Sequence, residues 1–384
     1  MKIDTQDRAE YLKLRKQFVS SYGYYLRQSA DLKTLEALFL AGNNIDPHFT
    51  YENLSVKVLQ ARLVMLKRAD QATATHLVRA KAFLHQRLIE TELLLCQATS
   101  WETGQLPERF ESLNEELFGG LDDEVFKRIV DTTQKGALSH FPVDENDYLS
   151  ENILLLKKLI KPVSRRLLSL IEKHSITQAA TLFLRRTGMY RRGWRVVEDQ
   201  TRPSSLVAPR TRRLILGTSI VNTTDSKKKL AILLHELVHV VRAKYPSPHP
   251  ESLNEQKELS AFEEGLAHAV ERLSLDKTLI PARYWRYFAI GLSKGIDRGK
   301  PRTAREVYEI LLPLYEKYAK GNDPKHFVFG TIVRVWKGTP FSVRGGAISK
   351  DIRYVHGSML FVEALSRQRF TKRDFRFLLT HKVK

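Results

Sequence analysis

The sequence predicts a mainly helical α+β protein, and three observations support this fold class. Apolar residues recur at three- and four-residue intervals through most of the 384-residue chain, which is the spacing of amphipathic helices. Two stretches, 193–199 and 212–222, have the alternating, β-branched character of short strands. Hydrophobic residues make up 42% of the chain, enough to form a sizeable core, so disorder is excluded as the dominant state.

The first part of the chain is predicted to be a helical region. Between residues 8 and 130, apolar side chains such as Phe83, Leu84 and Leu88 stand at helical intervals among Arg, Lys, Gln and Glu. A loop at 142–147 and a helix at 149–161 then lead into a segment of different composition. We therefore predict an N-terminal helical region over residues 1–140 and a second domain over 141–384.

The second domain is predicted to contain a small antiparallel sheet followed by helices. The two strands are separated by a turn at Pro203–Ser205. A helix is expected over 226–243, and Pro246, Pro248 and Pro250 separate it from a second helix that ends near Leu273. Further helices are expected at 281–297, 301–320 and 323–337, and a Gly-rich loop at 338–347 precedes a final helical stretch.

Composition limits the class of protein and its location. The formal net charge is +20, which favours acidic partners without choosing among nucleic acid, anionic membrane and acidic polypeptide. The single cysteine, Cys96, excludes a disulfide scaffold and a site built from thiolates alone, so any metal must be held by His and carboxylate. The charged N-terminus lacks the apolar run of a signal peptide, and no segment predicts a membrane span. We expect a cytoplasmic protein.

One helix carries a pattern typical of zinc peptidases, His235-Glu236-Leu237-Val238-His239. Side chains four residues apart share a helix face, so His235 and His239 can present ring nitrogens to one ion. Glu236 lies beside them, where a carboxylate can take a proton from metal-activated water. A structural pair of histidines is the alternative, but the helix is apolar and follows a β-rich segment, as in zincin peptidases.

A catalytic zinc site normally takes three protein ligands, and several downstream residues are candidates for the third. The position that a metzincin would fill with His is Tyr245, which disfavours that class. His249 stands in a Pro-rich loop. Glu263 and Glu264, at gluzincin spacing on a second helix, are the favoured candidates, and His268 is a further one. An antiparallel packing of the two helices would bring one carboxylate to the ion, and Gly265 would allow a close approach.

Two ordered blocks of sequence resemble the QEGLA-motif metallopeptidases, a family that includes microtubule-associated tyrosine carboxypeptidases. The first block is Glu264-Gly265-Leu266-Ala267, preceded by Glu263. The second follows the family's R-x-x-R-G … G-G-x-x-K-D-x-x-Y-x-x-G order with Arg334, Gly338, Gly345-Gly346, Lys350-Asp351, Tyr354 and Gly357. The resemblance covers roughly residues 190–360. The histidines here are four residues apart, whereas the family's H-E-x-G-T-H motif places them five apart.

The resemblance implies a gluzincin-like carboxypeptidase with one zinc ion. Its ligands would be His235, His239 and Glu264, and Glu236 would be the general base that returns its proton to the leaving amine. Tyr354, or a cation near Lys350, is the candidate to stabilise the oxyanion.

A carboxypeptidase also needs a cation for the terminal carboxylate of its substrate. Arg334, Arg344 and Arg353 near the Gly-rich loop are candidates for this role. The strand at 212–222 is expected to bind substrate as an antiparallel partner.

Local charge favours an acidic polypeptide as the substrate. Nine Arg fall between Arg185 and Arg213 against Glu198 and Asp199, and the segment 367–384 is also strongly basic. A generally basic, solvated surface is the simplest alternative explanation. A nucleic-acid-associated protein, including a metalloprotease working at DNA, is the alternative function, although no nucleic-acid-binding motif supports it.

Overall fold

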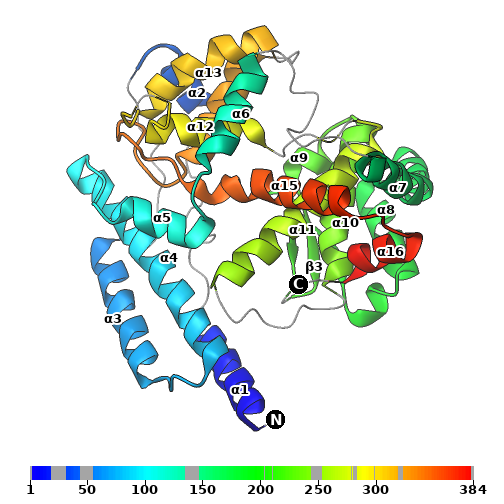
Figure 1. Cartoon of the computed structure of the whole chain (residues 1–384), viewed down its shortest axis with the longest axis horizontal. Coiled ribbons are helices and arrows are strands. Elements are labelled where there is room, and N and C mark those ends of the chain that lie inside the picture. The colour runs from blue at the N-terminus through cyan, green and yellow to red at the C-terminus, as the bar shows by residue number, and fades with distance from the viewer. Residues whose placement is uncertain are drawn as a thin grey trace. The chain divides into compact units, whose positions relative to one another are not determined.

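The computed structural model describes residues 2–18, 32–43, 55–134, 147–202, 204–209, 211–243, 253–277, 279, 283–297, 299–318 and 323–381 (Figure 1). Within these ranges the protein is mainly helical with one small sheet, which confirms the α+β class. None of the helices described combines the length and apolar character needed to span a membrane. Residues 244–252, which include His249 and the prolines expected to end a helix, lie outside the described residues.

The chain divides into two compact units that are not consecutive in sequence. Unit 1 comprises Met1–Leu138, Pro250–Lys257 and Arg283–Arg353, and unit 2 comprises Ser139–His249, Glu258–Ala282 and Tyr354–Lys384. The chain therefore passes from one unit to the other several times. The division expected at residue 140 remains a prediction.

Unit 1 begins with helices that pack through apolar faces. Leu14 from the first helix, Leu66 from the third and Leu84 from the fourth belong to one buried cluster. Figure 1 shows the third and fourth helices running side by side as a hairpin. These helices are α1 (Lys2–Gln17), α2 (Leu32–Leu40), α3 (Val56–Ala72), α4 (Val78–Thr103), α5 (Phe110–Phe118) and α6 (Asp123–Gln134).

The later part of unit 1 contains three helices and an ordered Gly-containing loop. They are α12 (Tyr284–Lys294), α13 (Ala304–Tyr318) and α14 (Pro324–Val335), close to the predicted bounds, and a short 3-10 turn, η2 (Ser349–Asp351), follows the loop. Asn114 of α5 fixes the end of this loop: its side chain donates to the carbonyl of Ala347 (3.1 Å) and accepts from the amide of Ser349 (2.9 Å). Buried hydrogen bonds of this kind hold an irregular segment in one conformation.

Unit 2 begins with α7 (Asp147–Lys173) and α8 (Ile176–Arg186), and a small sheet follows. A capping box of Ser175 and Gln178 starts α8, a helix that the sequence prediction missed. After the 3-10 turn η1 (Tyr190–Arg192), the strands are β1 (Arg195–Asp199), β2 (Leu206–Ala208) and β3 (Arg213–Gly217). The order is β1-β3-β2, with β1 parallel and β2 antiparallel to β3.

The prediction of an antiparallel sheet was therefore wrong, and so was the extent of the second strand. The short strand β2 follows the turn predicted at 203–205, where no strand was expected, and it occupies the antiparallel position beside β3. The parallel pairing of β1 with β3 follows, because two successive reversals return the chain to its first direction. Residues 218–221, expected in the strand, form the single-turn helix α9 (Thr218–Val221).

Four helices complete unit 2 and enclose its core. They are α10 (Ser226–Arg242), α11 (Leu253–Ser274, within unit 2 from Glu258), α15 (Ile352–Arg367, within unit 2 from Tyr354) and α16 (Lys372–Thr380). Leu233 and Leu237 of α10, Leu266 and Val270 of α11, and Phe361 of α15 are buried in one cluster. Because α10 and α11 contribute to this buried cluster, the His and Glu side chains on these helices lie next to the apolar core.

Candidate metal centre

Helix α10 positions the two histidines one turn apart. Asp225 caps its N-terminus by accepting from the amides of Lys227 (2.9 Å) and Lys228 (3.1 Å), which places a negative charge beside the basic first turn. The rings of His235 and His239 are half-buried, with centroids 5.2 Å apart. Helical geometry therefore puts both rings on one face, as the sequence predicts.

Helix α11 runs antiparallel to α10 at the site. His235, earlier on α10, contacts Glu271, which comes late on α11, whereas His239 contacts Glu263, one residue before Glu264. This reversed order of contacts defines the antiparallel direction. It brings carboxylates from several turns of α11 to the two imidazoles, so the expected arrangement of the two helices is observed.

The described residues contain one group of His, Cys, Asp or Glu side chains able to hold a metal ion, and it consists of His235, His239 and Glu264. Glu264 Oε2 lies 3.4 Å from His235 Nε2 and 3.8 Å from His239 Nε2. Tetrahedral zinc with bonds of about 2.0–2.1 Å requires donor atoms roughly 3.4 Å apart. Two of the three donor pairs lie near this spacing, and all three donor atoms lie within 4.8 Å of one another, so the group could hold a metal ion. These are the three residues that the sequence resemblance implies as ligands.

Each histidine uses its other ring nitrogen for a carboxylate. His235 Nδ1 lies 3.1 Å from Glu271 Oε2, and His239 Nδ1 lies 2.8 Å from Glu263 Oε1. An Nδ1–H donated to a carboxylate leaves the lone pair on Nε2, which is the nitrogen that faces Glu264. This arrangement separates the two favoured candidates for the third ligand: Glu264 faces the shared donor position, whereas Glu263 supports His239.

The acidic side chains around the two histidines carry negative charge that a cation would compensate. Four carboxylates, Glu236, Glu263, Glu264 and Glu271, lie around the two rings and are largely buried. Burial acts to lower the pKa of His235, but Glu264 and Glu271 outweigh it and raise that pKa to about 10. A proton on His235 or a metal ion can supply the missing positive charge, and a metal must displace the proton.

Glu236 is half-buried beside the two histidines, and the pKa of its carboxyl group lies above the ordinary value. Burial raises the pKa of its carboxyl group, and the nearby Glu264 and Glu271 raise it further, against the opposing effect of His235 and His239. A carboxyl group whose pKa lies above its ordinary value is better matched to proton transfer near neutral pH. The general-base role expected for Glu236 remains a prediction.

Sequence reasoning missed two residues of the site, Glu271 and Arg242. Glu271 lies seven residues after Glu264, and this spacing returns to the same helix face. Arg242 is 1% exposed; its Nε lies 4.0 Å from Glu263 Oε2 and its Nη1 donates to the carbonyl of Leu378 in α16. The helical spacing between Glu264 and Glu271 could have identified Glu271 from the sequence. No sequence pattern could have identified Arg242, because its partners come from distant segments.

Two glycines bring the two blocks of family-like sequence into contact within unit 2. A Cβ on Gly265 would lie 2.0 Å from the carbonyl oxygen of Gly357, and a Cβ on Gly357 would lie 1.8 Å from that of Ala261. Helices α11 and α15 therefore touch through their backbones. The close approach expected at Gly265 is real, but it is made to α15. Tyr354, half-buried one turn before Gly357, accepts from Ser358 Oγ through its carbonyl (2.8 Å), and its catalytic role remains a prediction.

The expected substrate-binding cations belong to unit 1. Arg334 makes a two-pronged pair with Asp351 (Nε–Oδ2 3.0 Å, Nη2–Oδ1 3.1 Å), and Arg286 also reaches Oδ2 at 3.0 Å. Burial alone would raise the pKa of Asp351, but the two guanidinium groups hold it well below its ordinary range. This pairing favours a structural role for Arg334.

Lys350 lies in the 3-10 turn η2, and Arg353 follows this turn in the first turn of α15. Burial, with Arg353 and Arg334 as neighbouring cations, lowers the pKa of Lys350 to about 7. Arg344 is occupied on the surface by Glu306 (2.8 Å) and by the carbonyl of Pro301 (3.0 Å). Contact of Lys350 or Arg353 with a substrate remains a prediction.

The sheet cannot bind substrate in the way expected from the sequence. Strand β3, within the segment 212–222, lies between β1 and β2 and uses both of its edges for pairing. An extended peptide can be added only at a free edge. The prediction that this strand takes an antiparallel substrate was therefore wrong.

Arginines that are scattered in sequence gather where β1 and β3 begin. Parallel pairing sets Arg195 beside Arg213, and the amide of Arg195 donates to the carbonyl of Arg212 (2.9 Å). Arg212 in turn donates to the carbonyl of Arg192 (2.7 Å), and Arg185 and Arg195 lie over the Tyr190 ring at 5.1 and 4.1 Å. Arg185, Arg192, Arg195, Arg212 and Arg213 are all exposed, and we call them the arginine surface.

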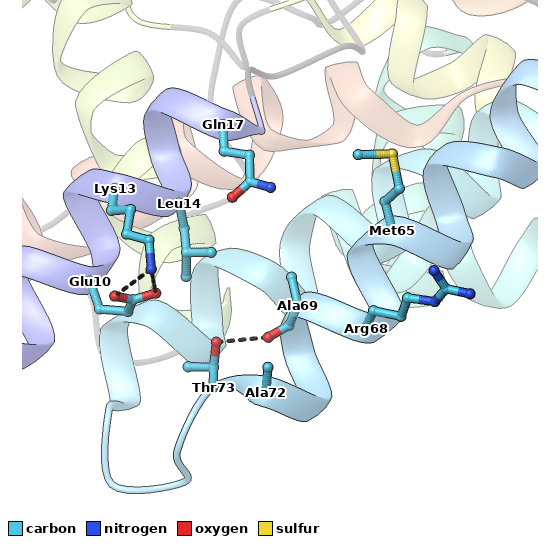
Figure 2. Close-up of a pocket in the computed structure, with 9 residues that line it drawn as sticks. All are labelled: Glu10, Lys13, Leu14, Gln17, Met65, Arg68, Ala69, Ala72 and Thr73. Carbon is cyan, nitrogen blue, oxygen red and sulfur yellow. Dashed lines mark hydrogen bonds and ion pairs between the residues drawn. The ribbon is translucent and has the colours of Figure 1, made fainter.

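A groove of about 420 Å³ between α1 and α3 in unit 1 is a poor candidate for catalysis (Figure 2). Lys13 and Glu10, one turn apart on α1, pair with each other at 3.2 Å, and Thr73 donates to the carbonyl of Ala69 at 2.8 Å. The remaining lining residues are Leu14, Gln17, Met65, Arg68 and Ala72. The acidic and basic side chains Glu10 and Lys13 pair with each other, so they are not positioned for proton transfer to a ligand in this groove.

Cys96 is a structural thiol. Its side chain is buried in the cluster that joins α4 and α5, and burial raises its pKa to about 11. The thiol is therefore protonated at neutral pH, and Cys96 does not belong to the metal-holding group found among the described residues.

Comparison with models of known families, with characterised proteins and with solved structures finds no match to this chain. The interpretation of the site rests on its geometry and on the sequence resemblance described above.

Proposed function

We propose that this protein is a zinc-dependent metallopeptidase with one zinc ion per chain, held by His235, His239 and Glu264. The observation that carries the proposal is the convergence of two Nε2 atoms and one carboxylate oxygen while both Nδ1 atoms contact other carboxylates. A buried cluster with this excess of negative charge is costly unless a cation compensates it. The donor set of two imidazoles and a carboxylate is that of gluzincin zinc sites.

The chemistry proposed is hydrolysis of an amide bond. Zinc would supply Lewis acidity to polarise the scissile carbonyl and to lower the pKa of a water molecule. Glu236 accepts the proton of the attacking water and then delivers it to the leaving amine, for which its raised pKa suits it. Tyr354, Lys350 and Arg353 remain the proposed residues for the oxyanion and for a terminal carboxylate.

An acidic polypeptide, cleaved near its C-terminus, is the proposed substrate. The resemblance to tyrosine carboxypeptidases favours removal of a C-terminal residue within a gluzincin-like fold. The arginine surface favours a chain rich in Asp and Glu, since exposed guanidinium groups bind carboxylates through paired hydrogen bonds. We propose a cytoplasmic location, in keeping with the lone buried cysteine.

Metal analysis and peptide hydrolysis together test this function. The wild-type protein should purify with one zinc per chain or take it up stoichiometrically, and Glu264→Ala should lose most of it. Glu236→Gln should retain zinc but lose at least about 100-fold in kcat, the range of general acid–base catalysis. Hydrolysis of acidic peptides with free but not amidated C-termini supports a carboxypeptidase. Equal zinc content in wild type and Glu264→Ala refutes the ligand set.

Nucleic-acid binding is the second candidate, because the arginine surface also fits phosphates. A double charge reversal, Arg192→Glu with Arg213→Glu, should raise KM for an acidic peptide and leave the hydrolysis of a neutral peptide unchanged. If the same change instead abolishes a salt-sensitive gel shift of a single-stranded oligonucleotide and leaves KM for the acidic peptide unaltered, the second candidate is favoured.

A further inference from the structure

The two histidines of the candidate metal centre are held by separate carboxylates from α11. Glu271 contacts His235. Glu263, which lies about two turns before Glu271 on α11, contacts His239. The exposed fractions of these carboxylate side chains are 19% and 11%, and those of the imidazoles are 13% and 16%. Both contacts are therefore shielded from solvent, where a hydrogen bond to a charged group is stronger than at the surface.

We infer that Glu271 and Glu263 are positioning residues that fix both imidazoles with Nδ1 as donor and Nε2 directed to the metal, and that Arg242 supplies a buried countercharge to Glu263. The inference rests on the metal site proposed above. A carboxylate that accepts from Nδ1–H orients the ring, selects the tautomer and makes Nε2 a better donor. Neither carboxylate is assigned as a ligand, because Glu264 provides the oxygen between the two Nε2 atoms.

Arg242 extends this arrangement beyond the two helices. It lies on α10 one turn after His239 and is 1% exposed. Its guanidinium faces Glu263 Oε2 at 4.0 Å and donates to the carbonyl of Leu378, near the end of α16. Helix α16 is therefore connected to His239 through Arg242 and Glu263. Loss of Glu263 would leave the buried charge of Arg242 without this opposite charge.

A simple ion-pair role for the two carboxylates gives a different expectation. If the histidines were imidazolium partners in a structural salt-bridge cluster, each ring would donate from both nitrogens, and loss of Glu263, Glu264 or Glu271 would affect folding alone. The observed contacts, with Glu264 at Nε2 and the other two carboxylates at Nδ1, are common to both roles, so metal affinity and tautomer are the measurements that separate them. The positioning role thus predicts effects on metal affinity and tautomer that a purely structural role does not.

Zinc affinity of the 384-residue chain tests the inference. Glu271→Gln and Glu263→Gln are compared with wild type and with Glu258→Gln, a control on an exposed position of α11. Apoprotein is titrated with zinc against a chromophoric chelator. We expect the two site variants to bind zinc about 10- to 100-fold more weakly, the range for outer carboxylate partners of metal-bound His. The control should match wild type.

A second measurement separates positioning from loss of folding. In ¹⁵N-labelled wild-type protein loaded with zinc, both imidazoles should show the Nδ1–H tautomer, and Glu271→Gln should alter the signals of His235 alone. Because Glu263→Gln leaves Arg242 without its charge partner, the double variant Glu263→Gln with Arg242→Met should recover thermal stability without recovering zinc affinity.

The outcomes are distinguishable. If wild-type protein binds no zinc, the proposed function fails. If wild type binds zinc stoichiometrically but both Gln variants bind it as tightly and keep the same imidazole signals, the positioning role is wrong while the metal site stands.

Discussion

The backbone contact between α11 and α15 makes Gly265→Ala the most informative single change. The new Cβ would lie 2.0 Å from the carbonyl oxygen of Gly357 and 2.8 Å from the amide nitrogen of Ser358, whereas ordinary contact begins at 3.4 Å. Backbone atoms cannot rotate away as a side chain can. The two helices must therefore separate, by roughly 1.4 Å if they move directly apart.

The expected cost combines two opposing contributions. Inserting a methyl group into a packed core costs about 1–3 kcal/mol, and a clash with backbone belongs at the upper end of that range. Replacing a helical Gly by Ala returns about 1 kcal/mol through conformational entropy and propensity. We expect the free energy of unfolding to fall by about 2 kcal/mol. Because Glu264 is adjacent on α11, zinc affinity should also fall at least about tenfold.

Urea unfolding followed by hydrogen exchange measures both the size and the location of the effect. Exchange should accelerate most in α11 and α15, where the helices separate. Gly330→Ala on α14 is a matched control, since Gly330 is exposed and a Cβ there meets no atom within 4 Å. The control should gain about 0.5–1 kcal/mol. If Gly265→Ala is as stable as this control, the close packing of α11 on α15 is wrong.

Three further predictions concern buried polar groups. Because the pKa of Lys350 is lowered to about 7, the unfolded chain binds the proton of this side chain more tightly than the folded chain does. The free energy of unfolding should therefore rise between pH 7 and 10, by up to about 1.4 kcal/mol per pH unit. Urea titrations should show this rise in wild type and not in Lys350→Met. Asp351→Asn leaves Arg286 and Arg334 without their negative partner and should cost about 3–5 kcal/mol, measured by urea unfolding at pH 7; a loss below 1 kcal/mol would contradict it. Asn152→Ala removes three hydrogen bonds, of 2.7, 2.7 and 2.9 Å, to backbone groups at and beyond the C-terminal end of α15. The free energy of unfolding, measured by thermal unfolding, should fall by about 2–4 kcal/mol, and hydrogen exchange should be faster at this end of α15.

The sequence by itself determined the features that depend on local periodicity. The apolar spacing predicted the mainly helical fold, and α10, α12, α13 and α14 lie close to their expected bounds. Four-residue spacing alone was enough to put His235 and His239 on one face, because a helix repeats every 3.6 residues. The candidate ligand Glu264 came from spacing and resemblance together.

Tertiary structure decided every feature that depends on contacts between distant segments. The parallel pairing of β1 with β3 occurs in a sheet with a third strand, β2, that was not predicted from the sequence. The choice of Glu264 over Glu263, and the roles of Glu271 and Arg242, depend on how α11 is rotated against α10. Gly265 and Gly357 set the close contact of α11 with α15. Sequence periodicity gives the face of a helix, but only packing against other helices sets which atom on that face meets its partner.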